Sequence, residues 1–337
     1  MSRVQGTPQR TFSLPELKWL EWQWCHDISG LVAFGLSDLL VLDLSWSTSS
    51  TWWHWKKIME KAQQLKVLIL KHCRGLTESP VSDAPMDLER LNLEGCSLLP
   101  GVGISFRNLG KLVSLNVKSC SFVEKLPEDI GSLVALEELY IDGTSIKAIE
   151  FPEGSCGKLK ILSACNCKSL SLSGSIGNLE SLSDLALDGT ELSELPNEIV
   201  LLKNLEKLYL RNCRKLEKLP EAIGRLERLQ VMDLSDTVVD EIPPSVKDLR
   251  KLKVLKMPRT FIKTFPEGIR NLERLKEIDF TFCRCLMGEC DITGLSSLRV
   301  LLLEKTKFSE VIGTKGQSYD FPNLVRDGKF RISERRR

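Results

Sequence analysis

The chain has 337 residues, of which 42% are apolar and 27% charged, and its formal net charge is +2. This composition excludes a disordered chain, and the near-neutral charge does not favour nucleic acid as a partner. No run of about 18 apolar residues is present, so we expect no membrane span. Because the N-terminus lacks a secretory pattern, we expect a cytoplasmic protein whose cysteines are reduced.

Tryptophan is concentrated near the N-terminus, since all seven lie between residues 19 and 55. We expect residues 1–11 to form an N-terminal extension and Trp22 to occupy a buried strand position. Trp19, Trp24 and Trp46 fall at outward strand positions, where they make an apolar surface. Two interpretations remain open for this cluster: a cap of the fold, or a docking surface for a partner or a preceding domain.

Residues 12–308 contain about 13 copies of a leucine pattern, L-x-x-L-x-L, which are 22–24 residues apart except for one spacing of 26. The long spacing predicts an insertion around Trp52–Trp55. Within it, Trp55, Ile58, Met59 and Ala62 have the spacing of the buried face of a helix. The copies begin at Leu17, Leu39, Leu65, Leu88, Leu112, Leu136, Leu159, Leu182, Leu205, Leu229, Leu252, Leu275 and Leu298.

Each copy predicts one strand followed by a short helical turn. In the copy that begins at Leu205, the residues Leu208 and Leu210 alternate with Lys207, Tyr209 and Arg211, as a strand buried on one side requires. Later in many copies comes a phrase such as Leu-Pro-x-x-Ile-Gly, whose proline favours the start of a turn. A coil of 23–24 residues has no room for a long helix, so we expect 3₁₀ or single-turn helices.

A small polar residue follows the strand in every copy. Parallel strands leave buried backbone groups at their exits, and hydroxyl or thiol side chains repeated once per coil can form a ladder that satisfies them. We therefore interpret most cysteines as structural, reduced and buried. The expected ladder consists of Cys73, Cys96, Cys120, Thr144, Cys167, Thr190, Cys213, Thr237, Thr260, Cys283 and Thr306.

The period ends near residue 309. Residues 309–337 are expected to form a partial cap, with apolar residues at Phe321, Leu324, Val325 and Phe330, and a basic tail. The tail is interpreted as a solvated end, with a nuclear-import signal as the alternative, so a nuclear location stays open.

Together these observations predict an α/β leucine-rich-repeat solenoid, or horseshoe, with a parallel β-sheet on its concave face and short helices on its convex face. Copies that end Cys-x-x-Leu-x-x-Leu-Pro, as at Cys213–Pro220, alternate with copies that end Thr-x-Val-x-x-Ile-Pro, as at Thr237–Pro243. These phrases and the opening at Leu14–Trp22 resemble the repeat domain of plant intracellular disease-resistance receptors. Those receptors have a Toll/interleukin-1-receptor-like domain and a nucleotide-binding domain before their repeats.

The resemblance implies a protein-recognition module for plant defense, either ligand-sensing or autoinhibitory. The implied partner is a pathogen or host protein, or a nucleotide-binding domain in trans, and we expect a monomer. A free-standing signalling scaffold, similar to plant intracellular Ras-group-related repeat proteins, is the alternative. The sequence has no phosphate-binding loop, so a nucleotide switch is not assigned.

Charged and aromatic side chains at outward strand positions are the candidate partner-binding surface on the concave face. Reversing Asp142 and Asp188 to Lys is expected to weaken partner binding, mainly through the association rate and in a salt-dependent way, without lowering stability. The alternative is an ordinary solvated sheet. The candidate residues are Glu138, Tyr140, Asp142, Asp184, Asp188, Lys207, Tyr209 and Arg211.

Nothing in the sequence predicts an enzyme, a cofactor or a metal site. The three histidines all lie in the first quarter of the chain, and no catalytic motif is present. Short-spaced cysteines at Cys283–Cys285 and Cys165–Cys167 suit zinc, but Cys283 and Cys167 are assigned to the ladder and no further ligand pair completes a site.

Overall fold

A computed structural model describes residues 16–48, 52–78, 80–81, 87–99, 108–126, 128–313 and 318–320. The chain divides into two compact units, Met1–Glu138 and Leu139–Arg337. The expected cap residues Phe321, Leu324, Val325 and Phe330, and the basic tail, lie outside the described residues.

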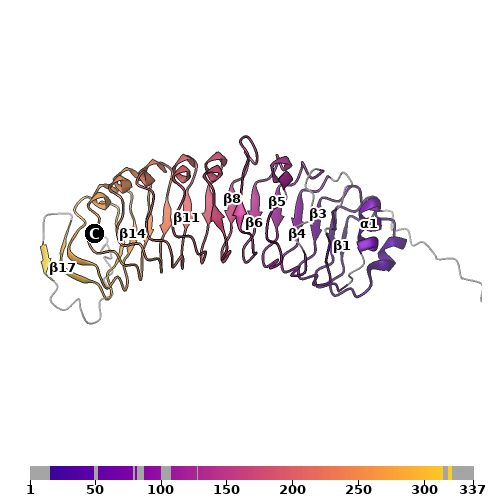
Figure 1. Ribbon diagram of the computed structural model, residues 1–337, viewed down its shortest axis with the longest axis horizontal. Helices are drawn as coiled ribbons and strands as arrows, with labels where there is room; N and C mark the ends of the chain where they lie inside the picture. Colours follow the sequence, from indigo (N-terminus) through magenta and orange to yellow (C-terminus); the bar gives the residue numbers. More distant parts are fainter. Residues whose placement is uncertain are drawn as a thin grey trace, which may run out of the picture. The chain divides into compact units, whose positions relative to one another are not determined.

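Each repeat contributes one three-residue strand to a parallel sheet, and the strands follow one another in chain order (Figure 1). In the first unit these are β1 (Trp19–Glu21), β2 (Val41–Asp43), β3 (Val67–Ile69), β4 (Arg90–Asn92) and β5 (Ser114–Asn116). From the boundary onward they are β6 (Glu138–Tyr140), β8 (Ile161–Ser163), β10 (Asp184–Ala186), β11 (Lys207–Tyr209), β12 (Val231–Asp233), β13 (Val254–Lys256), β14 (Glu277–Asp279) and β16 (Val300–Leu302). The thirteen strands match the thirteen copies of the leucine pattern.

The leucine pattern forms the core of both units. The middle residue of each strand and the residue directly after the strand point inward, and Leu208 and Leu210 are fully buried while the flanking Lys207 and Tyr209 are half-buried. The register aligns the inward apolar residues of neighbouring strands, because Leu185 pairs with Leu208 and Leu208 pairs with Met232. Each coil therefore buries its apolar side chains against its neighbours, as a solenoid requires.

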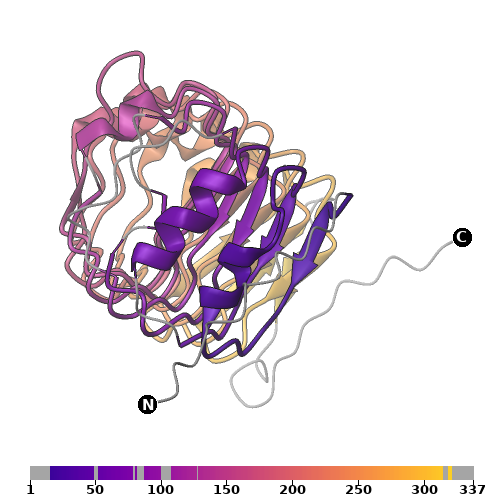
Figure 2. The ribbon, with the colours of Figure 1, turned by 90° about the vertical axis from the view of Figure 1, so that its right-hand side faces the viewer.

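Short helices occupy the other side of the coils, as the repeat length predicts (Figure 2). The 3₁₀ helices are η1 (Ile28–Ala33), η2 (Glu128–Ser132), η3 (Gly174–Asn178), η4 (Asn197–Leu201), η5 (Ile223–Arg225), η6 (Pro244–Asp248) and η7 (Glu267–Asn271). The described residues contain one α-helix, α1 (Trp52–Lys61), which lies in the predicted insertion. Trp55, Ile58, Met59 and Ala62 are buried, which confirms the predicted helix face.

Two smaller sheets lie outside the main one. β7 (Ala148–Ile149) pairs with β9 (Ser171–Leu172). β17 (Lys307–Ile312) pairs with both β15 (Met287–Asp291) and β18 (Ser318–Asp320), and it runs across residue 308, where the leucine pattern ends. The second small sheet thus links the last repeats by strand pairing that the leucine pattern does not predict.

Packing makes a direct prediction for the centre of the second unit. Leu208→Ala should lower the free energy of unfolding by about 2–5 kcal/mol, because Leu208 is fully buried between neighbouring coils. Lys207→Ala should change it by less than about 1 kcal/mol, because Lys207 is partly solvated in its pair with Asp184. Denaturant unfolding of both variants measures the difference, and equal losses would show that the strand register is wrong.

Candidate functional site: the outward face of the strands

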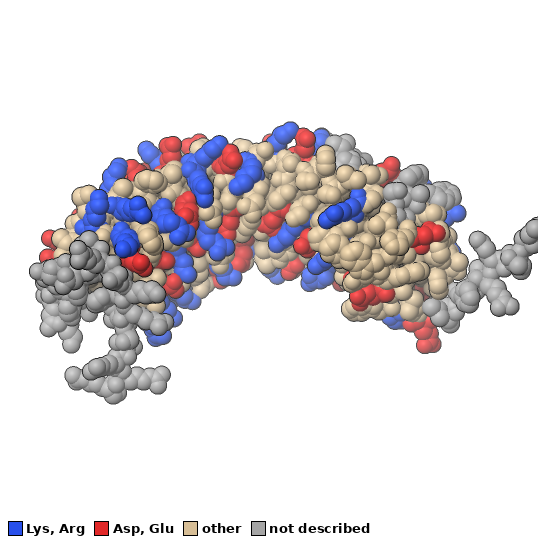
Figure 3. Space-filling model, turned by 90° about the horizontal axis from the view of Figure 1, so that it is seen from below, with Lys and Arg blue, Asp and Glu red and all other residues tan. Residues whose placement is uncertain are grey.

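Side chains of Lys and Arg are interspersed with those of Asp and Glu on the second unit, in the left part of Figure 3. Outward side chains come from the first and third residues of each strand and from the second residue after it. Strand pairing sets Asp184 beside Lys207 and Ala186 beside Tyr209. Tyr140 lies three strands from Tyr209, in the order β6-β8-β10-β11, at a separation of about 15 Å.

Most of these charges are paired with the next repeat. Lys207 Nζ lies 2.6 Å from Asp184 Oδ1, and Arg211 Nη2 lies 2.7 Å from Asp188 Oδ2. The hydrogen bond that Lys207 donates to Asp184 raises the pKa of Lys207, and those that Arg211 donates to Asp188 raise the pKa of Arg211. Arg211 also lies 5.8 Å from the centre of the Tyr209 ring. The cations are thus held in place before any partner binds.

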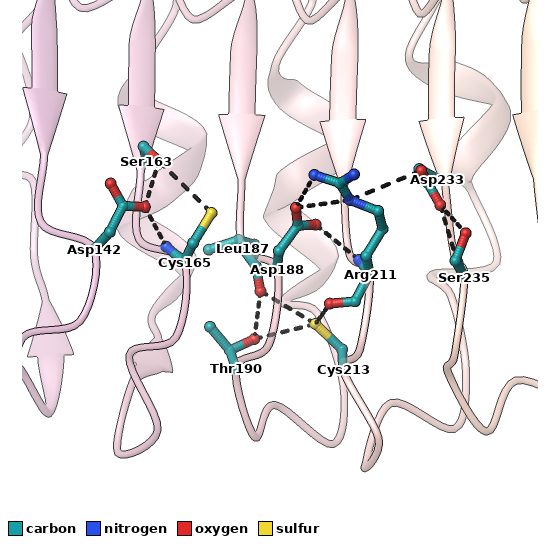
Figure 4. Close-up of polar contacts among 10 residues, drawn as sticks. All are labelled: Asp142, Ser163, Cys165, Leu187, Asp188, Thr190, Arg211, Cys213, Asp233 and Ser235. Carbon is teal, nitrogen blue, oxygen red and sulfur yellow. Dashed lines mark hydrogen bonds and ion pairs between the residues drawn. The ribbon is translucent and has the colours of Figure 1, made fainter.

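Two of the aspartates have a structural task that the sequence analysis missed. Asp142 Oδ1 accepts hydrogen bonds from the backbone N–H of Cys165 at 2.7 Å and from Ser163 Oγ at 2.5 Å. Asp188 Oδ1 accepts one from the backbone N–H of Arg211 at 2.8 Å (Figure 4). We therefore expect, in contrast to the sequence-based prediction, that reversal of either charge lowers stability, because each carboxylate accepts a backbone N–H of the following coil.

The same backbone group is satisfied differently in other repeats. Where the third strand residue is Asp or Asn, its own side chain accepts the N–H two residues on, as Asp233 does from Ser235 at 3.0 Å and Asn92 does from Glu94 at 3.1 Å. In the eleventh repeat the equivalent residue is Pro258, which has no N–H. Asp142 and Asp188 accept this N–H in the two repeats whose third strand residue is Ser163 or Tyr209, neither of which is Asp or Asn.

Glu138 belongs to the first unit, where its carboxylate lies 3.3 Å from Arg90 Nη1. The other seven candidate residues of the concave face lie in the second unit. Both members of this pair are first residues of their strands and remain partly exposed. Like the pairs of the second unit, this one links different repeats.

The tryptophan cluster differs from expectation in two ways. Trp19 is an outward residue of β1 and is 62% exposed, but Trp22 is 44% exposed and not buried as expected. Trp24 and Trp46 lie three residues beyond their strands, with φ angles of 60° and 65°, and not at strand positions. Their rings stack with centroids 5.0 Å apart.

A left-handed residue at this position is shared by all thirteen repeats and was not identified from the sequence. Glycine, Asn or Asp occupies it in six repeats, which suits that conformation. The others hold residues such as Trp24 and Arg259, so residue preference alone gives no consistent signal. The thirteen are Trp24, Trp46, His72, Gly95, Ser119, Gly143, Asn166, Gly189, Asn212, Asp236, Arg259, Phe282 and Lys305.

The ladder residue comes directly after the left-handed residue of each repeat. From the third repeat onward, each ladder Cys donates its thiol to a strand-exit carbonyl of the preceding repeat, at 3.0–3.2 Å. The pairs are Cys73 to Leu44, Cys96 to Leu70, Cys120 to Leu93, Cys167 to Ile141, Cys213 to Leu187 and Cys283 to Met257.

Threonine behaves differently from cysteine, because its hydroxyl donates to the carbonyl three residues earlier in its own repeat. The bonds are 2.7–2.9 Å long for Thr144, Thr190, Thr237, Thr260 and Thr306. Where a Cys repeat follows a Thr repeat, both side chains reach one carbonyl, as Thr190 and Cys213 do at Leu187 (Figure 4). The two side chains then lie 3.3 Å apart.

Two positions at the start of the series are exceptions. Cys25, in the first described repeat, donates to the carbonyl of Asp27 at 3.3 Å. Ser47 is buried at the equivalent place in the second repeat, and its hydroxyl finds no hydrogen-bond partner among the described residues.

The thiols are reduced and protected. All eleven cysteines lie within the described residues, and none forms a disulfide. Burial raises the pKa of Cys73 and of Cys120 to about 11. Burial and the nearby Asp142 carboxylate likewise raise the pKa of Cys165, on the outward face, to about 11. Across the described segments, no three His, Cys, Asp or Glu side chains gather as metal ligands would.

The coil, its strand and its ladder define a leucine-rich-repeat fold. The family model of a leucine-rich repeat region matches residues 208–318. Two solved structures share the fold: a leucine-rich-repeat protein of Leptospira interrogans, with a TM-score of 0.65 and 20% identity over 88% of this chain and 80% of that one, and an internalin of Listeria monocytogenes, with a TM-score of 0.62 and 16% identity over 87% and 82%.

Sequence relatives among curated proteins include plant disease-resistance proteins. Disease resistance protein RPP2A of Arabidopsis thaliana is 32% identical over 214 residues, which cover 63% of this chain and 14% of that protein. Disease resistance protein RPS4B of the same plant is 35% identical over 171 residues, which cover 49% and 14%. The repeats are thus related to those of plant disease-resistance proteins, which confirms the resemblance seen in the sequence. The matches span about one seventh of the length of these relatives.

The protected thiols predict slow chemical modification of the folded chain. At neutral pH, iodoacetamide should label the ladder cysteines at least tenfold faster after denaturation, because burial and raised pKa values keep them as thiols. Mass spectrometry of the alkylated peptides measures this. Rapid labelling of Cys73 and Cys120 in the native state would contradict the buried ladder.

Asp188 gives a second prediction. Asp188→Lys should lower the free energy of unfolding by about 2–4 kcal/mol, because it removes an acceptor of backbone N–H and sets a cation beside Arg211. Asp188→Asn retains an acceptor oxygen and should cost about half as much.

The matched control for Asp188 is Glu191→Lys. Glu191 forms an exposed ion pair with Lys215, so this substitution should change stability by less than about 1 kcal/mol. Denaturant unfolding compares the three variants. Equal stability of Asp188→Lys and the wild type would show that the Asp188 carboxylate does not stabilise the fold.

Proposed function

We propose that the chain is a protein-recognition module of the plant immune-receptor type, which acts in defence by sensing a protein ligand or by holding a nucleotide-binding domain inactive. The observation that carries the proposal is the set of cations fixed on the outward face of the second unit. Arg211 and Lys207 are held by aspartates of the preceding repeat, and Tyr209 lies between them. Relatedness to disease-resistance proteins supports the proposal.

Held cations favour recognition in a specific way. A side chain that is already ordered loses little conformational entropy when a partner binds. Charges that alternate across the face favour a partner with the complementary pattern, mainly through its association rate and specificity. Tyrosine and arginine are residue types that often dominate binding energy at protein interfaces. The face therefore suits a folded protein surface better than a small molecule.

The remaining expectations belong to the same proposal. We propose that the module acts in the cytoplasm, as a monomer, as a binding protein and not as an enzyme. In the described part of the chain no helix is long and apolar enough to cross a membrane. The partner is a pathogen or host protein, or a nucleotide-binding domain supplied by the same or another chain.

The test uses substitutions that spare the structural carboxylates. Tyr209→Ala with Arg211→Ala leaves Asp188 bonded to the backbone N–H of residue 211, so the fold should persist. Arg225→Ala, on the exposed side of η5, is the control. The tagged wild type and the control variant should capture the same proteins from leaf extract in equal amounts. The double variant should capture at least fivefold less of them.

Capture must be quantified by mass spectrometry at two salt concentrations, because the expected binding weakens as salt screens the face. Equal capture by the wild type and the double variant would overturn the assignment of this surface.

A further inference from the structure

Among the residues that the structure describes, none covers the core of the first repeat on the side away from β2. Leu20 and Trp22 occupy the inward positions that Leu42 and Leu44 occupy in the second repeat. Leu42 and Leu44 are fully buried, whereas Leu20 is half-buried and Trp22 is 44% exposed. A solenoid buries its apolar residues only where a neighbouring coil stacks on them, so this end needs a cover.

The backbone at this end is also open. The N–H of Trp22 donates to Asp43 at 2.8 Å, on the side of β2, and the N–H of Val41 in β2 donates back to Lys18 at 3.0 Å. Alternation along a strand then directs the N–H and C=O groups of Trp19 and Glu21 to the opposite side. Among the described segments no strand pairs there, because β1 is the first strand of the sheet. This edge can accept an added strand.

An aromatic stack begins at the same edge. Trp24 stacks on Trp46, with ring centroids 5.0 Å apart and planes at 13°. Trp46 stacks on His72 with centroids 4.0 Å apart and planes at 24°, and His72 covers Gly95, where a Cβ would clash with the imidazole. All three rings belong to left-handed residues, a conformation that disfavours bulky side chains. The outer side chain, Trp24, is 60% exposed.

The charge at this edge is acidic, although the whole chain is slightly basic. Residues 16–48 include five Asp or Glu and one Lys. Glu16 and Glu21 are exposed, and Glu21 stands on β1 between Trp19 and Trp22. In the described part of the chain, Glu21 Oε1 accepts a hydrogen bond from Gln23 Nε2 and Glu21 makes no ion pair with Lys or Arg. The edge therefore presents carboxylates and indole rings together.

We propose that the first unit binds a basic, extended segment of a partner protein, which adds as a strand to β1 and places a Lys or Arg on Trp24. An added strand lies about 4.8 Å from β1, which matches the spacing of the Trp24–Trp46 stack. A cation on that strand then lies within about 6 Å of the indole and close to Glu21. A second copy of this edge is disfavoured, because the carboxylates of the two copies would repel each other.

The probe is a synthetic nine-residue peptide of alternating Val and Arg with blocked ends, and its control alternates Val and Glu. Fluorescence anisotropy with the full chain should show binding of the Val-Arg peptide alone. Trp24→Asn removes the indole but suits the left-handed backbone, so it should fold and weaken binding about fivefold. Trp24→Phe should restore most of the affinity, and Glu21→Lys should weaken binding more than fivefold.

Two further measurements keep the proposal separate from the proposed function. Phe261→Ala, at an exposed residue of the second unit, should leave binding of the peptide unchanged. Amide hydrogen exchange at Trp19 and Glu21 should be fast in the free chain and slow with the Val-Arg peptide.

Three outcomes would overturn the proposal: equal binding of both peptides, unchanged affinity of Trp24→Asn, or amides of Trp19 and Glu21 already protected in the free chain. The last result would mean that the chain covers its own edge. None of these outcomes bears on Tyr209 and Arg211, whose test uses the second unit.

Discussion

The structure depends on one requirement: every coil must satisfy the polar backbone groups at the point where its strand ends. At that point the chain turns through a left-handed residue, and one backbone N–H beside the turn has no strand partner. In most repeats the buried carbonyl before the turn accepts the backbone N–H three residues on, at 3.0–3.4 Å, and keeps a second lone pair for a further donor. The carbonyl receives a thiol from the next coil or a hydroxyl from its own coil. In seven repeats the N–H donates to an Asp or Asn side chain. The Cys, Thr, Asp and Asn side chains at the strand exits thus have one shared role, which is to satisfy backbone polar groups there.

This requirement also shapes the surface that we propose for recognition. Asp188 accepts the backbone N–H of Arg211 and at the same time holds its guanidinium, so one carboxylate stabilises the coil and positions a cation. Asp142 has only the structural part of that role in the bonds to Ser163 and Cys165. Residues available for partner contact are therefore those whose loss leaves the coil intact, chiefly Tyr209, Lys207 and Arg211.

The repeat period, the strands, the short helices and the buried leucines followed from the sequence, because spacing and apolar alternation encode them directly. The roles of Asp142 and Asp188 did not, since a carboxylate at an outward position has the same sequence pattern whether it is solvated or bonded to backbone. Trp22 was misplaced for another reason. Its position predicts burial, but burial needs a neighbouring coil, and the first repeat has one only on the β2 side.

The shared carbonyl offers the most direct test of this account. The carbonyl of Met257 accepts Thr260 Oγ1 at 2.9 Å and Cys283 Sγ at 3.0 Å. In a double-mutant cycle with Thr260→Val and Cys283→Ala, each single variant keeps one of these donors, whereas the double variant loses both. Denaturant unfolding should show that the double variant loses at least about 1 kcal/mol more than the sum of the single losses. Additive losses would contradict the claim that these side chains are present to satisfy the strand-exit carbonyl.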